Sequence, residues 1–339
     1  MGPLSDRSVE ALPAPWRLTL VTNPDDCNLR CVMCAGHSAA RPEPHRGPRR
    51  RMSLALARLA LDGLADHGLR ELIPSTMGEP LLWRHLDALL DLLSAHGVRL
   101  NLTTNGSWPG LGAAAWAERL VPLASDIKVS WNGASRETSE ALMPGLDHEQ
   151  ALRDLRTLAR VRDEHEARSD HRCTLTLQVT AQRRNVDELP DIVRLAASFG
   201  LDRVKVHHVQ AHWPALRPTR LDGDPDGRRR WNAAVAEAHT VAGRVVLQNL
   251  RPLCERTGDL PRGPCPFLGR EAWVGPRGSF RPCPHPAVVD GALGSFGRLG
   301  DATLLELWRG PAYRRLLATW DAQPTCRACP FRRYDTAPS

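Results

Sequence analysis

Three cysteines near the start of the chain, Cys27, Cys31 and Cys34, lie at C-x3-C-x2-C spacing on one short segment. Three thiolates can hold three irons of a four-iron cluster and leave the fourth iron open to another ligand. Structural zinc usually has four protein ligands, so a trio suits it less well, although His37 or His45 could complete a zinc site. The spacing therefore favours an iron–sulfur cluster with one vacant position.

A second set of cysteines lies in the C-terminal third of the chain, at C-x17-C and then C-x2-C spacing. Four soft ligands of this kind can bind zinc or a four-iron cluster, and spacing alone does not decide between them. With nine cysteines in all, a chain expected to stay in a reducing compartment is predicted to use them for metal or redox chemistry. The four candidate ligands are Cys265, Cys283, Cys326 and Cys329.

Two cysteines remain outside these sets. Cys173 opens a predicted strand and is expected to be a small buried apolar residue. Cys254 shortly precedes the second set. It is a candidate for three roles: a structural thiol, an alternative cluster ligand, or a hydrogen-atom donor to a substrate radical.

The elements that must position these cysteines alternate between strand-like and helical segments over about 200 residues. Six βα units of this kind predict an α/β fold with a parallel sheet and helices outside it, an open (βα)6 form of the eight-stranded TIM-like barrel. In such folds the chemistry lies at the C-terminal ends of the strands. The predicted strands are residues 16–23, 70–76, 173–180 and 202–209, together with residues 98–106 and 126–133, each of which is predicted as a strand with the turn that ends it.

The first cysteine segment and three short motifs all follow predicted strands. The motifs are Gly78-Glu79-Pro80 after the second strand, Thr104-Asn105-Gly106 after the third and Ser130-Trp131-Asn132-Gly133 after the fourth. Together with C-x3-C-x2-C, they resemble the radical S-adenosylmethionine (SAM) superfamily over about residues 15–210. The resemblance implies a cluster that binds SAM, cleaves it and yields a 5′-deoxyadenosyl radical, which takes a hydrogen atom from a substrate C–H bond.

The same resemblance assigns roles to individual residues. Cys27, Cys31 and Cys34 would bind the [4Fe-4S] cluster, and Glu79 with its flanking backbone would face the methionine ammonium of SAM. Met33 would contact the adenine. The other expected cofactor contacts are Gly78, Pro80, Asn105, Ser130, Val179 and Thr180.

The C-terminal cysteines, with the "LGD…LW" segment between them, resemble the SPASM/twitch extensions of radical SAM enzymes. Because no cysteine follows Cys329, the resemblance implies the shortened twitch form, a β-hairpin plus helix that binds one auxiliary [4Fe-4S] cluster. The expected organisation is an N-terminal extension (1–14), a radical SAM partial barrel (15–212), a linker and helix (213–243) and a twitch domain (244–339).

Twitch enzymes of this size resemble epimerases and dehydrogenases of aminoglycoside and antibiotic pathways. The barrel is expected to begin almost at once, which favours a small polyhydroxylated substrate over a ribosomally made peptide, the main alternative. The expected reaction is epimerisation with Cys254 as donor, or oxidation to a ketone through the auxiliary cluster. His207 and His208 could take the carbinol proton, and Trp131 and Trp213 are candidates for the pocket wall.

Charge and hydropathy restrict the remaining possibilities. The net charge of +7 and pI near 9.2 permit a nucleic-acid partner, and thus RNA modification, without requiring one. No signal peptide or apolar span is expected, so a cytoplasmic enzyme with no membrane contact is predicted. Its expected partners are a small-molecule substrate and a flavodoxin or ferredoxin reductant. A non-catalytic electron carrier or SAM sensor is the rival from another class.

Overall fold

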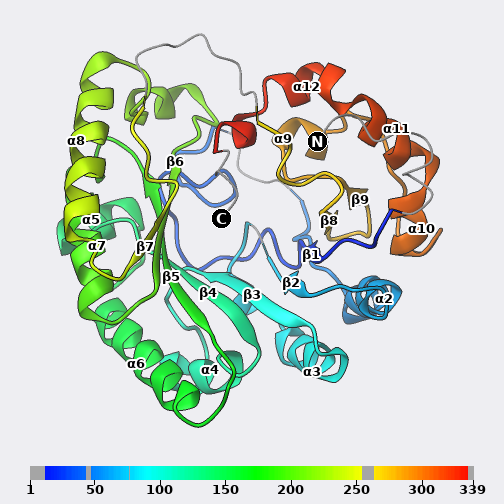
Figure 1. The fold of residues 1–339 in the computed structure, drawn as a ribbon, viewed down its shortest axis with the longest axis horizontal. Coiled ribbons are helices and arrows are strands. Elements are labelled where there is room, and N and C mark those ends of the chain that lie inside the picture. The colour runs from blue at the N-terminus through cyan, green and yellow to red at the C-terminus, as the bar shows by residue number, and fades with distance from the viewer. Residues whose placement is uncertain (1–11, 43–46, 76, 254–262, 335–339) are drawn as a thin grey trace.

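The computed structural model describes residues 12–42, 47–75, 77–253 and 263–334. Within these residues one curved sheet of nine strands runs through the molecule in the order β7-β6-β5-β4-β3-β2-β1-β8-β9 (Figure 1). The strands are β1 (Arg17–Leu20), β2 (Glu71–Ile73), β3 (Arg99–Thr104), β4 (Ala124–Ser130), β5 (Thr174–Ala181), β6 (Arg203–His208), β7 (Val246–Gln248), β8 (Glu271–Val274) and β9 (Phe280–Arg281).

Helices follow the strands and cover the outer side of the sheet from α2 to α8 (Figure 1). They are α2 (Leu54–Ala65), α3 (Leu86–His96), α4 (Gly112–Leu120), α5 (Arg136–Leu142), α6 (His148–Glu166), α7 (Leu189–Ser198) and α8 (Pro225–Val241). The C-terminal region adds α9 (Pro286–Val289), α10 (Leu304–Arg309), α11 (Pro311–Thr319) and α12 (Pro324–Arg327). Short 3-10 segments lie at Pro80–Leu82, Val186–Glu188, Pro214–Thr219, Trp320–Ala322 and Pro330–Tyr334.

Local sequence signals account for many of the element ends. Ser53 and Asp147 cap α2 and α6. Each side chain accepts a hydrogen bond from the backbone N–H of the third residue of its helix. Gly97 ends α3 with a φ of 64°, a left-handed conformation that favours glycine. The apolar faces of these helices pack on the sheet in one continuous core that includes Leu18, Leu64 and Leu158.

The parallel α/β barrel predicted from the sequence is confirmed, and the sheet extends further than expected. β7 pairs in parallel with β6, and β8 pairs in parallel with β1. The Arg17 guanidinium on β1 bridges Glu71 on β2 and Glu271 on β8 at 2.6 and 2.9 Å. The sheet therefore continues without a break from the predicted barrel into the region expected as a separate small domain.

The predicted hairpin is present in the C-terminal region. β9 runs antiparallel to β8, and Gly278 takes a φ of 87° in the connecting turn. The expected single helix after it is divided into α10 and α11, because Gly310 adopts an extended conformation and Pro311 starts a new helix. In the part of the chain described, no helix has the length and apolar character needed to cross a membrane.

Candidate active site and auxiliary-cluster site

The first cysteine segment is held against the loop that follows α5. The backbone N–H groups of Arg30 and Val32 donate to the carbonyl oxygens of Pro144 and Leu142 at 2.9 and 3.0 Å. Leu29 is buried in a small apolar cluster with Leu142 and Met143, against which Cys27, Cys31 and Met33 also pack. The loop is therefore positioned by packing, since it has no regular secondary structure of its own.

Ion pairs fix the two residues that precede Cys27. The Arg51 guanidinium donates two hydrogen bonds to the Asp26 carboxylate at 2.6 and 2.9 Å, and Arg49 adds a third at 3.1 Å. Arg50 binds Asp25 in the same two-point manner, at 2.7 and 2.9 Å. The three consecutive arginines, Arg49 to Arg51, thus hold the base of the cysteine segment.

The Gly78-Glu79 turn lies directly beneath the same segment. The Glu79 N–H donates to the Asp26 carbonyl oxygen, and the Asn23 side-chain amide donates to the Glu79 carbonyl oxygen, both at 2.8 Å. A Cβ atom added at Gly78 would lie 2.0 Å from the Asn23 carbonyl oxygen. Only glycine allows this approach of the two backbones, so the turn and the cysteine segment form one unit.

The Glu79 side chain points to the turn after β3. It is 1% exposed, and its carboxylate accepts hydrogen bonds from the Thr104 hydroxyl at 2.8 Å and the Asn105 N–H at 2.7 Å. Burial raises the pKa of Glu79 to about 7, against the opposing effect of these hydrogen bonds. The carboxylate thereby ties the "GEP" and "TNG" motifs together, a contact that their spacing in the sequence did not predict.

Asn105 reaches from the same turn to the thiols. Its side-chain amide donates to the Cys27 sulfur at 3.7 Å and to the Asn28 side-chain oxygen at 2.9 Å. Burial is the main reason why the pKa values of Cys27 and Cys31 are raised, that of Cys31 to about 12. The neighbouring thiols act in the same direction, which places the three sulfur atoms within electrostatic reach of one another.

These thiols line a cavity of about 680 Å³ inside the curve of the sheet. Of the predicted cofactor contacts, two do not line it: Val179 faces the core and Pro80 is buried beneath the turn. Trp131 and Trp213 are also buried away from the cavity, and Trp273 on β8 lines it instead. The predicted residues at the cavity wall are Cys27, Cys31, Met33, Cys34, Gly78, Glu79, Asn105, Ser130, Thr180, His207 and His208.

The two histidines at the end of β6 face this cavity in a largely desolvated setting. Burial lowers the pKa of His207 to about 4 and lowers that of His208 as well. Both rings are therefore neutral near pH 7 and can accept a proton only weakly. His208 also packs on Trp231, with 4.4 Å between ring centroids.

Charged side chains at the floor of the cavity were not identified from the sequence. Asp126 on β4 binds Lys128 at 3.1 Å and Arg203 at 3.0 Å, and Thr176 donates to it at 2.8 Å. Alternate residues of each strand face inward, so the strand periodicity could have identified them.

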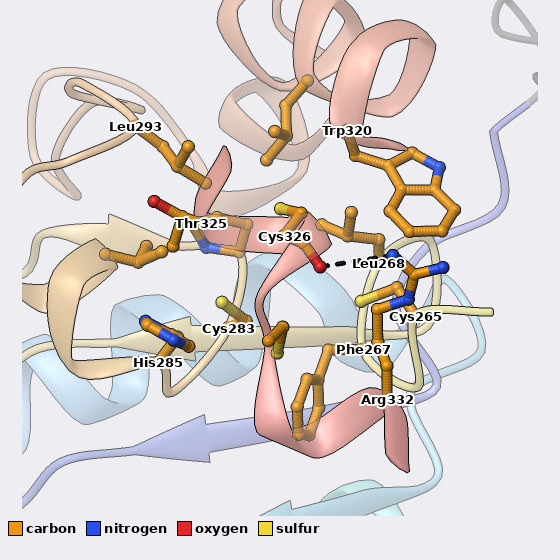
Figure 2. A pocket seen from close by; sticks show the side chains of 14 residues that line it. Cys265, Phe267, Leu268, Cys283, His285, Leu293, Trp320, Thr325, Cys326 and Arg332 are labelled. Atoms are coloured by element: carbon orange, nitrogen blue, oxygen red, sulfur yellow. Dashed lines mark hydrogen bonds between the residues drawn. The ribbon is translucent and has the colours of Figure 1, made fainter. Parts of the chain in front are cut away.

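The four C-terminal cysteines converge on a second, small pocket. Cys265 precedes β8, Cys283 follows β9, Cys326 lies in α12 and Cys329 just after it. All four line a pocket of about 20 Å³, and Figure 2 shows Cys265, Cys283 and Cys326 around it. Residues far apart in the sequence are thus brought together as the resemblance implied.

Burial raises the pKa of all four thiols, that of Cys283 to about 12 and that of Cys326 to about 11. The Arg332 guanidinium opposes this at three of them, the exception being Cys283. It donates to the carbonyl oxygen of Gly263 at 2.6 Å. It also donates to the carbonyl oxygen of Cys326 at 3.2 Å, the bond that Figure 2 shows as a dashed line. Four soft ligands beside a fixed cation suit a group that takes them as thiolates.

Two aromatic side chains lie between the two sites. Phe267 lines the small pocket, Phe331 lines the large cavity, and their rings meet edge to face with centroids 5.4 Å apart. The Trp273 ring, which lines the large cavity, also packs against the Phe267 ring, with 6.2 Å between the ring centroids. Cys254 and His45 lie outside the described residues, while His37 bonds the Pro24 carbonyl oxygen through its ring Nε2 at 3.0 Å.

Two family profiles match this chain. The profile of the radical SAM superfamily matches residues 24–165, and that of the SPASM iron–sulfur cluster-binding domain matches residues 265–330. This chain carries a radical SAM domain followed by a SPASM domain. As a radical SAM enzyme it uses SAM, one [4Fe-4S] cluster that binds SAM and one auxiliary [4Fe-4S] cluster.

Solved structures share the fold of this radical SAM enzyme at low sequence identity. Streptococcus suis SuiB bound to S-adenosylmethionine has a TM-score of 0.66 and 16% identity, over 97% of this chain and 74% of that chain. The protein anSMEcpe with bound AdoMet has a TM-score of 0.64 and 14% identity, over 95% of this chain and 92% of that chain. Both comparisons support the partial barrel with its C-terminal SPASM domain.

Among curated proteins, PqqA peptide cyclases are similar along both domains. The protein from Xanthomonas campestris pv. campestris (strain B100) is 27% identical over 315 residues, 91% of this chain and 78% of that protein. The protein from Methylobacterium nodulans is 27% identical over 338 residues, 96% of this chain and 81% of that protein. The expectation of an aminoglycoside epimerase or dehydrogenase is therefore wrong, because the similar proteins are peptide cyclases.

Proposed function

We propose that this radical SAM enzyme modifies a peptide by joining two of its residues through a new covalent bond. The observation that carries the proposal is the similarity to PqqA peptide cyclases, which covers 91% of this chain and 78% of those proteins. The match spans the SAM-binding region, the barrel and the SPASM region alike. The peptide alternative, set second on sequence grounds, thus replaces the small polyhydroxylated substrate.

In this proposal Cys27, Cys31 and Cys34 hold the SAM-binding cluster, and Met33 with the ends of β3 to β5 contacts SAM. The cavity of about 680 Å³ lies within the size range of ligand sites, with room for SAM and a substrate side chain together. Cys265, Cys283, Cys326 and Cys329 hold the auxiliary cluster.

Joining two residues removes two hydrogen atoms: one ends in 5′-deoxyadenosine, and the other leaves as a proton and an electron, for which an auxiliary cluster provides an acceptor. A thiol that donates a hydrogen atom, the role considered for Cys254, has no place in such a reaction. The flavodoxin or ferredoxin reductant and the cytoplasmic location stay predictions.

The test is an anaerobic reaction of reconstituted protein with SAM, dithionite and a set of synthetic peptides that includes the PqqA peptide of the similar proteins. We expect one peptide to become lighter by two hydrogen atoms only when both clusters are present, with 5′-deoxyadenosine formed alongside it. Formation of 5′-deoxyadenosine that responds to a small polyhydroxylated compound, and to no peptide, would contradict the proposal.

A further inference from the structure

A row of polar side chains crosses four neighbouring strands on the cavity side of the sheet. Ser130 on β4 is in register with Gln178 on β5, Gln178 with Lys205 on β6, and Lys205 with Gln248 on β7. All four line the large cavity. Neighbouring strands are about 4.8 Å apart, so the row extends over about 14 Å.

The side-chain polar groups of this row are unpaired within the part of the chain that the structure describes. Among the described residues, none of the four side chains makes a hydrogen bond, and Lys205 makes no ion pair. Polar groups inside a protein are normally satisfied. All four side chains are partly exposed to the cavity, so a ligand bound there can take the hydrogen bonds that the protein leaves open.

The row directly below it provides the contrast. Lys128 is in register with Thr176, and Thr176 with Arg203. These three side chains all bind the Asp126 carboxylate, at 3.1, 2.8 and 3.0 Å. In this lower row the polar side chains are bonded to one another and stabilise the barrel. The side chains in the row of Lys205 are not.

The charges around Lys205 balance one another and leave the charge of Lys205 itself without a matching carboxylate. Asp126 is shared by Lys128 and Arg203, and Arg17 is held by Glu71 and Glu271. Burial and the nearby Lys128 lower the pKa of Lys205 to about 8. An anion bound beside it would favour the ammonium form. The charged and titratable groups that act on Lys205 are Arg17, Asp126, Lys128, Arg203, His207 and Glu271.

Composition indicates the same position. The chain has 45 lysine and arginine residues, but only two of them are lysines, and both Lys128 and Lys205 line this cavity. Arginine serves as the cation at every other position, including Arg17 and Arg203 of the same cavity. An ammonium is a compact point charge with three donors, whereas a guanidinium is a wide planar fork. Between Gln178 and Gln248 the row therefore presents a point charge and not a fork.

The geometry points to a carboxylate-binding site at Lys205, flanked by the amides of Gln178 and Gln248, that holds an acidic group of the substrate peptide in the barrel. This assignment deepens the proposed function and rests on it for the peptide. The carboxylate belongs to an acidic side chain or to the C-terminus of the peptide. SAM also carries a carboxylate, so the test must separate it from the substrate.

The presence of only two lysines makes a direct measurement possible. Protein labelled with ¹³C at the lysine ε-carbon gives two lysine signals in NMR, with Lys128 as the internal control. The reconstituted enzyme is titrated with SAM and then, at saturating SAM, with one of three probes. They are N-acetylglutamate N-methylamide, N-acetylglycine and, as the uncharged control, N-acetylglutamine N-methylamide.

We expect a carboxylate probe to shift the Lys205 signal and raise its pKa, while the Lys128 signal and the amide probe show no such effect. The carboxylate probe that binds identifies the side chain or the C-terminus as the source. A Lys205 signal already saturated by SAM alone, an equal response to the amide probe, or no response to any probe would overturn the assignment.

Two variants complete the test. Because these variants lack the Lys205 signal, probe binding is measured for them and for the wild type by titration calorimetry. Lys205→Met removes the charge with little change in length and should weaken carboxylate binding by about tenfold or more, whereas Lys205→Arg should keep part of it. Probe binding requires no turnover. Carboxylate binding without any cyclised peptide would therefore refute the proposed function alone, and a cyclised peptide with no carboxylate binding would refute this site alone.

Discussion

The two cysteine sites differ in the space that each leaves around its sulfur atoms. Three thiols open onto a cavity of about 680 Å³, whereas four thiols enclose a pocket of about 20 Å³. A ligand set that is one short beside a wide cavity leaves an iron for SAM. A complete set in a tight pocket holds its cluster through the protein alone. The count of thiols and the shape of the cavity thus indicate the same division of roles.

The largest expected effect separates the two sites by removing one thiol from each. Cys31→Ala should lose about four of eight irons and reduce 5′-deoxyadenosine formation to the protein-free background, because the SAM-binding cluster is lost. Cys283→Ala should lose about as many irons yet still cleave SAM, while the peptide product disappears. Iron analysis and chromatography of both products measure this.

The comparison would fail if Cys283→Ala kept its first cluster, by iron content, and still formed no 5′-deoxyadenosine. The second site would then take part in SAM cleavage itself.

Gly78→Ala tests how the first site is held. The added Cβ would lie 2.0 Å from the Asn23 carbonyl oxygen and 2.6 Å from that of Asp26, so the turn must separate from the cysteine segment. We expect a loss of about 4 kcal/mol in the free energy of unfolding. Gly223→Ala, where a Cβ meets nothing within 4 Å, is the matched control and should change it by less than about 1 kcal/mol. If both variants lowered the free energy of urea unfolding by the same amount, the Gly78-Glu79 turn and the cysteine segment would not form one unit.

Glu79→Gln tests the electrostatics of the same unit. Because burial raises the folded-state pKa of Glu79 to about 7, the folded protein holds this proton more tightly than the unfolded chain. The raised pKa of Glu79 contributes at most about 3 kcal/mol to the free energy of unfolding. This contribution is fully present below about pH 4.5 and is lost as the pH rises through about 7. The difference in unfolding free energy between wild-type and variant apoprotein should follow this slope. A difference that stays flat from pH 4.5 to 7 would contradict the assigned burial effect.

The smallest expected effect concerns the second site. Arg332→Met removes a cation that acts on three of the four thiols. The loss should lower the reduction potential of the auxiliary cluster by some tens of mV, on the order of other nearby charge changes. Arg327→Met, at an exposed position next to Cys326, is the control and should shift the potential less. A redox titration in which both variants match the wild type would remove Arg332 from this role.

Much of the fold was predictable because strand and helix periods alternate regularly from residue 16 to residue 209. The cysteine spacings predicted two sets of metal ligands because iron–sulfur chemistry requires particular residue types, and the structure brings the thiols of each set to one cavity. The ties between motifs were not predictable. The Glu79 carboxylate meets the Asn105 N–H only after two strands pair, and no local pattern encodes that contact.

The substrate could not be predicted correctly from the same signals. A barrel that begins early in the sequence was interpreted as evidence for a small molecule, yet substrate choice depends on the cavity wall, which alternate residues of several strands build together. Lys205 and Gln178 are adjacent only through strand register. The short strand β7 was expected outside the barrel, although pairing with β6 brings Gln248 to the same wall.

One measurement tests most directly the claim that a single site of the two binds SAM. Electron paramagnetic resonance of the reduced protein is recorded with and without SAM in the Cys283→Ala and Cys31→Ala variants. SAM should change the spectrum of the cluster that remains in Cys283→Ala and leave unchanged that of Cys31→Ala. A SAM-dependent change in Cys31→Ala, or none in Cys283→Ala, would contradict the account.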